Sequence, residues 1–356
     1  MQRNTPAPKE TKSLASQVKA KVNNTTVKSK DKLDGNTEVM ISTGSTLLDL
    51  AISGTRVHGG GIPGGILVEI FGPSGCGKTI LLCEIAGAVQ RKGGEVMFRD
   101  PEARLNKVFA QIFDLKTEEM DYDTPDTVTE VFEAVRKWEP ITAKKQINGI
   151  FTDSLAALST DMEMEKDEGD KMGMRRAKEF SEGLRKIARV LVEKNLLMVC
   201  SNQVRTNTDA GTYGPKTTTP GGVAIGFYSS LRLQARNPEK IRITKTVAGK
   251  EVKRVIGVET TFEVFKSSID KPYRSAPVTI LFSYGIDQIR DNLQYIKNFT
   301  SNKKYTVNGR ELSNVMDKAI AMVEEEGLEE ELRENVISLW EDIEGRFETE
   351  RKQKQR

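Results

Sequence analysis

Residues 72–79 read GPSGCGKT and directly follow the apolar run ILVEIF at residues 66–71. This order matches the G-x-x-x-x-G-K-[ST] pattern in its usual context, where a buried strand leads into a phosphate-binding loop. The glycines let consecutive backbone N–H groups curl around phosphate oxygens, while Lys78 supplies a positive charge and Thr79 a hydroxyl for magnesium. An ordinary glycine-rich turn is the alternative, but the helix-like segment at residues 80–90 favours a nucleotide site.

The nucleotide site is expected to include the whole loop and the residue that follows it. These residues are Gly72, Pro73, Ser74, Gly75, Cys76, Gly77, Lys78, Thr79 and Ile80. Cys76 stands where oxidation would obstruct the nucleotide, so the sequence also indicates a reducing compartment.

The composition is that of a globular protein. The chain has 356 residues, of which 37% are hydrophobic, so it can bury one large or two ordinary cores. No apolar run is long enough to cross a bilayer and the polar N-terminus has no signal-peptide core, so we expect a soluble cytoplasmic protein with no membrane partner. The net charge of +3 decides nothing about nucleic acid by itself. The single histidine, His58, excludes a histidine-based metal site.

From Val39 to about Ile286, short apolar runs alternate with longer helical segments. This alternation predicts an α/β fold in which helices flank a mostly parallel, twisted sheet. Strands are expected at residues 67–71, 95–99, 149–152, 196–200, 231–235, 261–265 and 278–282, and helices at residues 80–90, 127–138 and 175–194.

The two ends of the chain differ from this pattern. Residues 1–36 hold eight Lys or Arg against three Asp or Glu and no aromatic residue, so we expect residues 1–38 to form a basic, partly helical arm. Leu14 and Val18 are spaced for a short polymerisation helix, although a solvated tail explains the composition equally well. The other expected divisions are a core at 39–290 and a small helical C-terminal region at 291–356, with helices at 312–326 and 328–350 and a basic tail.

Polar residues follow three of the expected strands at their carboxyl ends. Asp153 closes the run IFT, and a phosphate loop needs a carboxylate on a neighbouring strand to orient magnesium. Asp100 and Glu102 follow a second strand, where hydrolysis would need a base, although acids are also common in a first helical turn. Asn202 and Gln203 end a third strand, either as a sensor of the terminal phosphate or as ordinary capping amides.

Two segments fit neither the strand nor the helix pattern. Residues 160–173 are acidic and end in Lys-Met-Gly, and residues 205–222 are rich in Thr, Gly and Pro. Both follow the ends of expected strands, where doubly wound sheets place their binding loops.

Six blocks of the sequence stand in the order and spacing of one protein family. They are ISTGS at 41–45 leading to LD at 48–49, GPSGCGKT at 72–79, the Asp-x-Glu at 100–102, DSLAAL at 153–158, SNQVR at 201–205 and TTTPGG at 217–222. Over roughly residues 41–290 the chain therefore resembles the RecA recombinase family.

The resemblance implies a RecA-like P-loop ATPase core that binds ATP and Mg²⁺. It further implies a DNA-dependent ATPase that forms helical filaments on single-stranded DNA and exchanges strands with homologous duplex DNA, in DNA recombination and repair. Single-strand-binding and loader proteins are further expected partners.

The resemblance also assigns roles to individual residues. It implies catalytic roles for Lys78, Glu102 and Gln203, which would bind phosphate, activate the attacking water and sense the terminal phosphate. Thr79 and Asp153 are implied as magnesium ligands. The other implied nucleotide contacts are Asp100, Phe109, which would stack on adenine, and Lys266, which would reach the nucleotide of a neighbouring subunit.

The two irregular segments match the family's DNA-binding loops. The implied contacts with single-stranded DNA are Met172, Gly173, Lys178, Ser181, Arg185, Arg205, Gly221 and Gly222. Lys178 and Arg185 lie seven residues apart on an expected helix, hence nearly on one face, where they would follow a phosphate backbone. A solvated helix face would look identical.

Several positions depart from the family pattern. Ser268 stands where a second interface lysine is often found, two residues after Lys266, and Lys271 is a possible replacement. Arg104 places an unusual charge close to Glu102. The C-terminal region matches only vaguely and ends in basic rather than acidic residues, which favours a divergent member such as a phage-encoded one.

Two other functions stay open. A RecA-fold motor such as a ring helicase shares the nucleotide core, and the TTTPGG block is the feature that favours a recombinase over it. A mediator that binds ATP and a recombinase, but exchanges no strands itself, would fit the departure at Ser268.

Overall fold

The computed structural model describes residues 38–141, 146–159, 172–206, 217–218, 222–348 and 351. These residues belong to one compact unit, Glu38–Arg356. The expected basic arm at 1–38 lies outside the described residues except for Glu38, and the division expected at residue 290 stays a prediction. None of the described helices is long and apolar enough to cross a membrane.

A nine-stranded sheet with the order β13-β12-β11-β10-β3-β7-β6-β4-β5 forms the centre of the molecule. The strands from β10 to β5 pair in parallel, and β11, β12 and β13 add to the β10 edge as antiparallel strands. The predicted α/β class with a mostly parallel sheet is confirmed. The strands are β3 (Leu67–Gly72), β4 (Val96–Arg99), β5 (Met120–Asp123), β6 (Asn148–Thr152), β7 (Leu196–Gln203), β10 (Leu231–Val247), β11 (Lys250–Ser267), β12 (Ser275–Leu281) and β13 (Gly285–Ile286).

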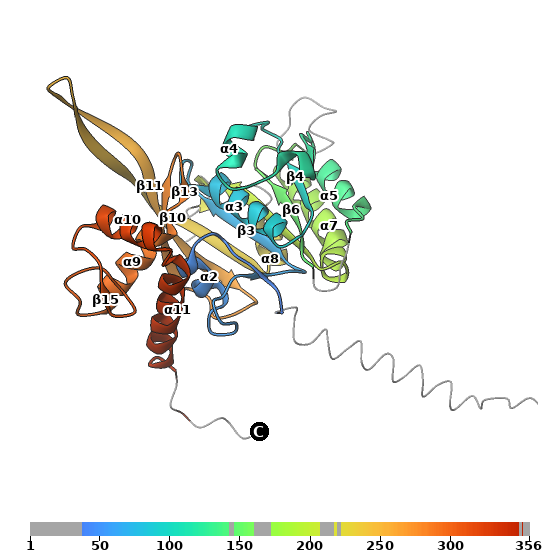
Figure 1. Ribbon diagram of the computed structural model, residues 1–356. Coiled ribbons are helices and arrows are strands. Elements are labelled where there is room, and N and C mark those ends of the chain that lie inside the picture. The colour runs from blue at the N-terminus through green and yellow to red at the C-terminus, as the bar shows by residue number, and fades with distance from the viewer. Residues whose placement is uncertain are drawn as a thin grey trace, which may run out of the picture. The chain divides into compact units, whose positions relative to one another are not determined.

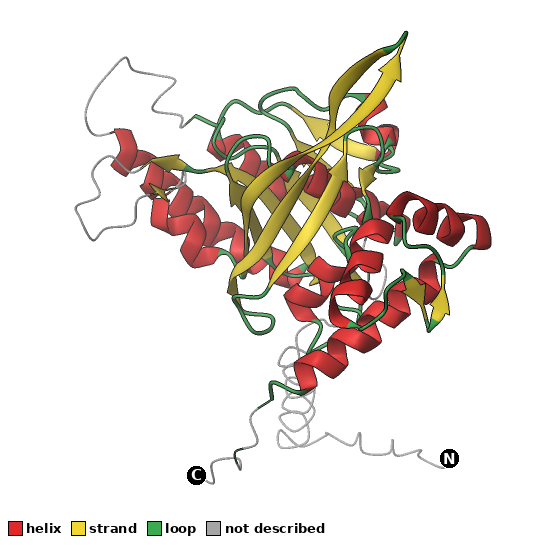
Figure 2. Ribbon diagram, turned by 90° about the vertical axis from the view of Figure 1, so that its left-hand side faces the viewer, coloured by secondary structure: helices red, strands yellow, loops and turns green. Residues whose placement is uncertain are grey.

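Helices cover both faces of this sheet (Figure 2). Because side chains alternate along a strand, Val68 and Ile70 of β3 pack into one apolar cluster and Leu67 packs into the other. The first cluster includes residues of α2 (Thr46–Ser53), α3 (Lys78–Arg91), α9 (Gln288–Phe299), α10 (Met316–Glu326) and α11 (Glu329–Gly345). The second includes residues of α5 (Val128–Lys137), α7 (Met172–Glu193) and α8 (Gly222–Tyr228).

Three short strand pairs, one short helix and one 3₁₀ turn complete the described elements. They are the strand pairs β1 (Met40–Ile41) with β2 (Ile62–Pro63), β8 (Arg205–Thr206) with β9 (Thr217–Thr218) and β14 (Thr306–Val307) with β15 (Arg310–Glu311), the helix α4 (Lys107–Gln111) and the 3₁₀ turn Thr117–Glu119.

Strands β10 and β11 are much longer than the sequence predicted. Each alternates buried and half-exposed residues where it lies in the sheet, and both then continue as an exposed two-stranded ribbon that extends away from the sheet (Figure 1). The expected strands at 231–235 and 261–265 cover only the buried part, because the exposed part is rich in charged residues and its two strands are held by pairing with each other.

One predicted helix boundary agrees with the structure at the capping signal of α5, and two others, in α10 and α11, differ from it. α5 begins with a capping box between Thr127 and Glu130, close to its predicted start. The start predicted at Leu312 is wrong: Arg310–Glu311 pair with β14, and α10 begins only at Met316. The end predicted at Glu350 is also wrong, because α11 ends at Gly345.

A fully buried carboxylate, that of Glu69, joins the three central strands. Its Oε1 atom accepts a hydrogen bond of 2.9 Å from Asn202 Nδ2 on β7. Its Oε2 atom lies 2.5 Å from Arg232 Nε on β10, and the Arg232 guanidinium stacks over the Phe71 ring at 4.5 Å. The charge of Glu69 is therefore tolerated inside the sheet because both oxygens have partners.

Replacing Glu69 by Ala should lower the free energy of unfolding by about 3 to 5 kcal/mol, because the change leaves a largely buried guanidinium without its counter-charge. Equilibrium denaturation in urea measures the loss. Glu263→Ala is the matched control: Glu263 pairs with Arg236 at 2.9 Å in the same sheet, but Arg236 is 44% exposed, so about 1 kcal/mol or less is expected. Equal losses in the two variants would contradict the role given to the buried pair.

A second buried carboxylate fixes α9 to the sheet. Asp291 accepts hydrogen bonds from the backbone N–H of Thr279 at 2.9 Å and from its hydroxyl at 2.7 Å. Burial raises the pKa of the Asp291 carboxyl to about 7, although the two hydrogen bonds from Thr279 oppose this shift. The folded protein therefore holds a proton on Asp291 that the unfolded chain releases near pH 4.

Asp291 should make the protein less stable as the pH rises from about 4 to about 7. In that window the unfolded chain has lost the proton and the folded protein has not, so each step up in pH favours unfolding. The Asp291→Asn variant keeps a neutral partner for Thr279 and should lack this part of the dependence. The difference between wild type and variant in the free energy of unfolding should change by up to about 4 kcal/mol between pH 4 and pH 8. A difference that is constant with pH would disprove the assignment.

Candidate nucleotide-binding site

The phosphate loop connects β3 to α3 and depends on two glycines. Gly75 and Gly77 have φ angles of 74° and 84°, in the left-handed region that glycine adopts without strain. A Cβ atom on Gly77 would also lie 2.2 Å from Ile280 Cδ1. The loop delivers the chain to the N-terminus of α3, where Gly77 provides no side-chain cap. The uncapped N–H groups and the helix dipole make this end suited to an anion.

The two residues after Gly77 are held in different ways. Lys78 Nζ donates to the carbonyl oxygens of Gly72 at 3.1 Å and Pro73 at 2.7 Å, so the ammonium group lies over the loop. The Thr79 hydroxyl donates to Asp153 Oδ2 at 2.6 Å, and the other oxygen of Asp153 accepts a hydrogen bond from the Ser201 hydroxyl. Asp153 is thus fixed between α3 and β7 at the carboxyl end of β6.

The oxygen atoms of Thr79 and Asp153 fit a magnesium ion. Mg²⁺ prefers hydroxyl and carboxylate oxygens and usually takes only one or two carboxylates from the protein. Among the described residues, no group of three or more His, Cys, Asp or Glu could hold a metal ion. Thr79 and Asp153 would hold such an ion, and its other ligands would be water or a bound molecule.

Glu102 lies after the end of β4, next to the loop. Its Oε1 atom accepts a hydrogen bond of 3.4 Å from the Ser154 hydroxyl, and its Oε2 atom lies 2.6 Å from Arg104 Nη2. Ala103, between the two charged residues, has a φ angle of 49° and lies in the left-handed region. Glu102 is 18% exposed, whereas Arg104 is 75% exposed.

These groups surround one cavity of about 290 Å³. The residues of the predicted site that line it are Ser74, Gly75, Gly77, Lys78, Thr79, Ile80, Glu102, Phe109, Asp153 and Gln203. They come from five separate parts of the chain: the loop after β3, Glu102 after β4, Phe109 of α4, Asp153 after β6 and Gln203 at the end of β7. Four of these parts lie at the carboxyl ends of parallel strands, where open α/β sheets bind their ligands. Val258 and Phe282 also line the cavity and were not predicted, because they come from the antiparallel part of the sheet.

Other predicted nucleotide contacts do not line this cavity in the described structure. Cys76 is buried and donates to the Pro73 carbonyl oxygen at 2.9 Å, and burial raises the pKa of its thiol. Asp100 accepts hydrogen bonds from the Leu105 N–H at 2.8 Å and the Tyr122 hydroxyl at 3.1 Å. These contacts give Asp100 a structural role behind the cavity, and its contact with a nucleotide stays a prediction.

Lys266 lies elsewhere, on β11 beside the end of α8. Its Nζ atom donates to the carbonyl oxygens of Gly226 at 2.8 Å and Phe227 at 3.0 Å. Partial burial lowers the pKa of this ammonium group. Since the prediction was that Lys266 reaches a neighbouring subunit, its position away from the cavity of its own chain does not test it.

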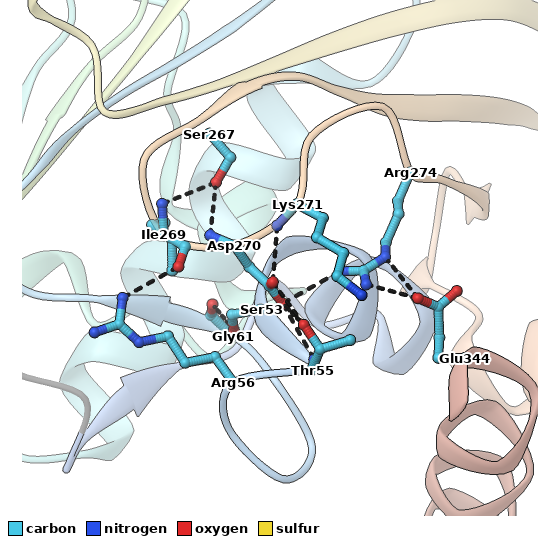
Figure 3. Close-up of polar contacts among 10 residues, drawn as sticks. All are labelled: Ser53, Thr55, Arg56, Gly61, Ser267, Ile269, Asp270, Lys271, Arg274 and Glu344. Atoms are coloured by element: carbon cyan, nitrogen blue, oxygen red, sulfur yellow. Dashed lines mark hydrogen bonds and ion pairs between the residues drawn. The ribbon is translucent and has the colours of Figure 1, made fainter. Parts of the chain in front are cut away.

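The turn that follows Lys266 is fixed to two helices (Figure 3). Asp270 accepts hydrogen bonds from the N–H and the hydroxyl of Thr55, at the end of α2. Arg274 pairs with Asp270 at 3.2 Å and with Glu344 of α11 at 2.6 Å. Lys271, proposed above as a substitute for the missing interface lysine, lies in this turn and is exposed.

The predicted DNA contacts are only partly described. On α7, Lys178 and Arg185 are exposed and Ser181 is half-buried, and α7 packs against α5 and α8. Met172 and Gly173 begin α7, and Gly222 begins α8. Arg205, two residues after Gln203, pairs with Thr218 in the β8–β9 ladder. Gly221 and most of the segments 160–173 and 205–222 lie outside the described residues.

Sequence reasoning missed the contacts of three polar residues of the cavity, although Arg104 was already noted as an unusual charge close to Glu102. Ser201 fixes Asp153, Ser154 contacts Glu102, and Arg104 forms the ion pair with Glu102. Ser154 and Ser201 were visible only as neighbours of residues already chosen, in DSLAAL and SNQVR. A hydroxyl beside a strand-end carboxylate is a weak signal, because serine is common at such ends.

Comparison with known proteins agrees with this geometry. The family model described as the RecA N-terminal domain matches residues 11–287. A protein named Protein RecA from Thermus thermophilus is 36% identical over 255 residues, which cover 71% of this chain and 69% of the relative. Another Protein RecA, from Wolbachia pipientis, is 35% identical over 250 residues, or 70% of this chain and 65% of the relative. The chain therefore belongs to the RecA family of recombinases.

Proposed function

We propose that this protein is an ATP-dependent recombinase that forms filaments on single-stranded DNA and catalyses homologous pairing and strand exchange. One observation carries the proposal. Gln203 lines the cavity beside Lys78 and Glu102, and the chain continues within two residues into the β8–β9 ladder at the base of the segment 205–222. A change at the terminal phosphate can thus reach a predicted DNA-binding loop over a few bonds.

The hydrolytic step follows from the groups around the cavity. ATP would place its phosphates against the loop N–H groups and Lys78, with its adenine beside Phe109. Magnesium, held by Thr79 and Asp153, would neutralise phosphate charge when bound. Glu102 would take a proton from the attacking water as its oxygen bonds to the terminal phosphorus, while the bond to the ADP oxygen breaks. The products are ADP and inorganic phosphate.

Coupling to DNA would use the same residues in both directions. If Gln203 contacts the terminal phosphate, ATP favours the DNA-binding form of the segment 205–222, and single-stranded DNA bound to that segment favours ATP. The exposed Lys178 and Arg185 would extend the DNA path along α7. Lys266 of one subunit would reach the nucleotide of the next subunit in the filament. Homologous duplex DNA, single-strand-binding proteins and loader proteins complete the proposed partners.

Lys78→Ala should abolish the ATP-dependent reactions. Loss of the only ammonium group on the phosphate loop should lower ATP turnover on single-stranded DNA by about 100-fold or more, by analogy with the removal of one transition-state donor. Turnover is measured by phosphate release and strand exchange by gel assay. Lys116→Ala, which removes a half-exposed lysine paired with Glu119, is the control and should behave as wild type. Unchanged exchange in Lys78→Ala would refute the proposal.

Electron microscopy of the wild type separates the alternatives. Helical filaments on single-stranded DNA with a non-hydrolysable ATP analogue are expected. Closed rings would favour a motor. A mediator would instead be indicated if the protein binds ATP but exchanges no strands in the gel assay.

Arg185→Ala should weaken the binding of single-stranded DNA and flatten its salt dependence. Each lost phosphate contact should lower the slope of log affinity against log salt by about 0.7. Fluorescence anisotropy at several salt concentrations gives the slope. Arg310→Ala is the control, because Arg310 is also exposed but lies on β15. β15 pairs with β14, whose Val307 packs in the first apolar cluster, whereas α7 packs in the second. Equal slopes for Arg185→Ala and wild type would remove Arg185 from the DNA path.

A further inference from the structure

Arg104 is the second cation that lines the nucleotide cavity, besides Lys78. The two cations are held differently. Lys78 donates to carbonyl oxygens of its own loop, whereas Arg104 pairs with the carboxylate of Glu102. The Arg104 side chain is 75% exposed, so little packing fixes its position.

The ion pair engages Glu102, the residue proposed as the general base for hydrolysis. Glu102 Oε1 accepts a hydrogen bond from the Ser154 hydroxyl at 3.4 Å, and Oε2 lies 2.6 Å from Arg104 Nη2. A general base must present a free lone pair to the attacking water. In this arrangement the Arg104 guanidinium lies beside Oε2, the Glu102 oxygen that would otherwise accept a hydrogen bond from the attacking water.

The backbone around Arg104 is fixed while its side chain is not. The Ala103 N–H donates to the Asp100 carbonyl oxygen at 3.0 Å, and the Leu105 N–H donates to the Asp100 carboxylate at 2.8 Å. Ala103 keeps a left-handed conformation, which costs a residue with a Cβ atom about 1 kcal/mol or more. The turn therefore holds the Arg104 Cα atom at the rim of the cavity and leaves the long side chain free to change partners.

The contact with Glu102 is also easy to exchange. The buried Oε2 atom of Glu102 has no hydrogen bond of good geometry among the described residues, so the 2.6 Å contact is mainly a charge interaction. A pair with one partner this exposed contributes about 1 kcal/mol or less. A terminal phosphate offers a guanidinium more charge and two acceptor oxygens in the geometry that arginine prefers.

We propose that Arg104 moves between Glu102 and the terminal phosphate of bound ATP. Paired with Glu102, it restrains hydrolysis; transferred to the phosphate, it frees Glu102 for the water and stabilises the charge that develops as the terminal phosphoryl group leaves ADP. Arg104 thereby distinguishes ATP from ADP, which lacks that phosphate. This inference rests on the proposed ATP hydrolysis at the same site.

The experiment is a double-mutant cycle on nucleotide affinity with the full chain. Affinities for ADP and for a non-hydrolysable ATP analogue are measured for wild type, Arg104→Ala, Glu102→Gln and the double variant. Arg104→Ala should lower the affinity for the analogue by about 10-fold, because one charged hydrogen bond is lost, and should change the affinity for ADP by less than about 2-fold. Glu102→Gln removes the charge that pairs with Arg104, so this variant should bind the analogue more tightly relative to ADP than the wild type does. The double variant should not show this increase in affinity.

Two further variants separate this role from a structural one. Arg104→Lys keeps the charge without the paired donors and should recover part of the selectivity for the analogue. Arg346→Ala is the matched control, because Arg346 is 73% exposed and pairs at 2.6 Å with Asp342 of α11. It should leave both affinities at the wild-type values.

The outcomes are distinguishable. If Arg104→Ala weakens ADP and the analogue equally, or if Glu102→Gln has the same effect with and without Arg104, the exchange of partners is refuted. Failure of the wild type to hydrolyse ATP on single-stranded DNA would refute the proposed function instead. The affinity cycle would still report whether Arg104 contacts the terminal phosphate.

Discussion

A single buried carboxylate ties together the parts of the molecule that the function requires. Glu69 lies on the strand that leads into the phosphate loop, and its two oxygens bind Asn202 and Arg232 on the strands at either side. Asn202 precedes Gln203 at the cavity. Arg232 lies over the rings of Phe71 and Phe265, and Phe265 precedes Lys266 at the proposed subunit contact. The buried charge of Glu69 thus links the strand that ends at Gln203 to Arg232, whose guanidinium lies beside the ring next to Lys266 on β11.

The nucleotide site could be predicted from the sequence to the extent that it depends on strand ends. A parallel sheet brings the carboxyl ends of its strands together, so an apolar run followed by Asp153 or by Gln203 already indicates where the side chain will lie. The pairing of individual oxygens could not be predicted in this way. Asp100 and Glu102 stand two residues apart at one strand end, yet Glu102 lines the cavity and Asp100 is used to fix its own loop.

The elements that sequence reasoning missed are fixed largely by contacts between distant parts of the chain. The helix α2 is short and buried throughout, and the exposed part of β10 and β11 is held by strand pairing. The helix α9 is amphipathic and is capped by Asp287, but contacts with distant residues fix its position. Asp291 of α9 shows this: its hydrogen bonds to Thr279 join residues twelve positions apart and need the folded sheet to exist. Departures from the family such as Arg104 are visible in the sequence, but their meaning depends on side-chain distances.

The exposed ribbon of β10 and β11 has strand edges that no other described strand covers, unlike the strands inside the sheet. Where the ribbon leaves the sheet, the outer edge of each strand carries backbone N–H and C=O groups to which a strand of another molecule could add. Basic side chains recur along this stretch, at Lys240, Arg242, Lys245, Lys250, Lys253 and Arg254. Two ribbons laid edge to edge would bring these like charges together, so the composition of the ribbon protects the protein from aggregation through its most exposed strands.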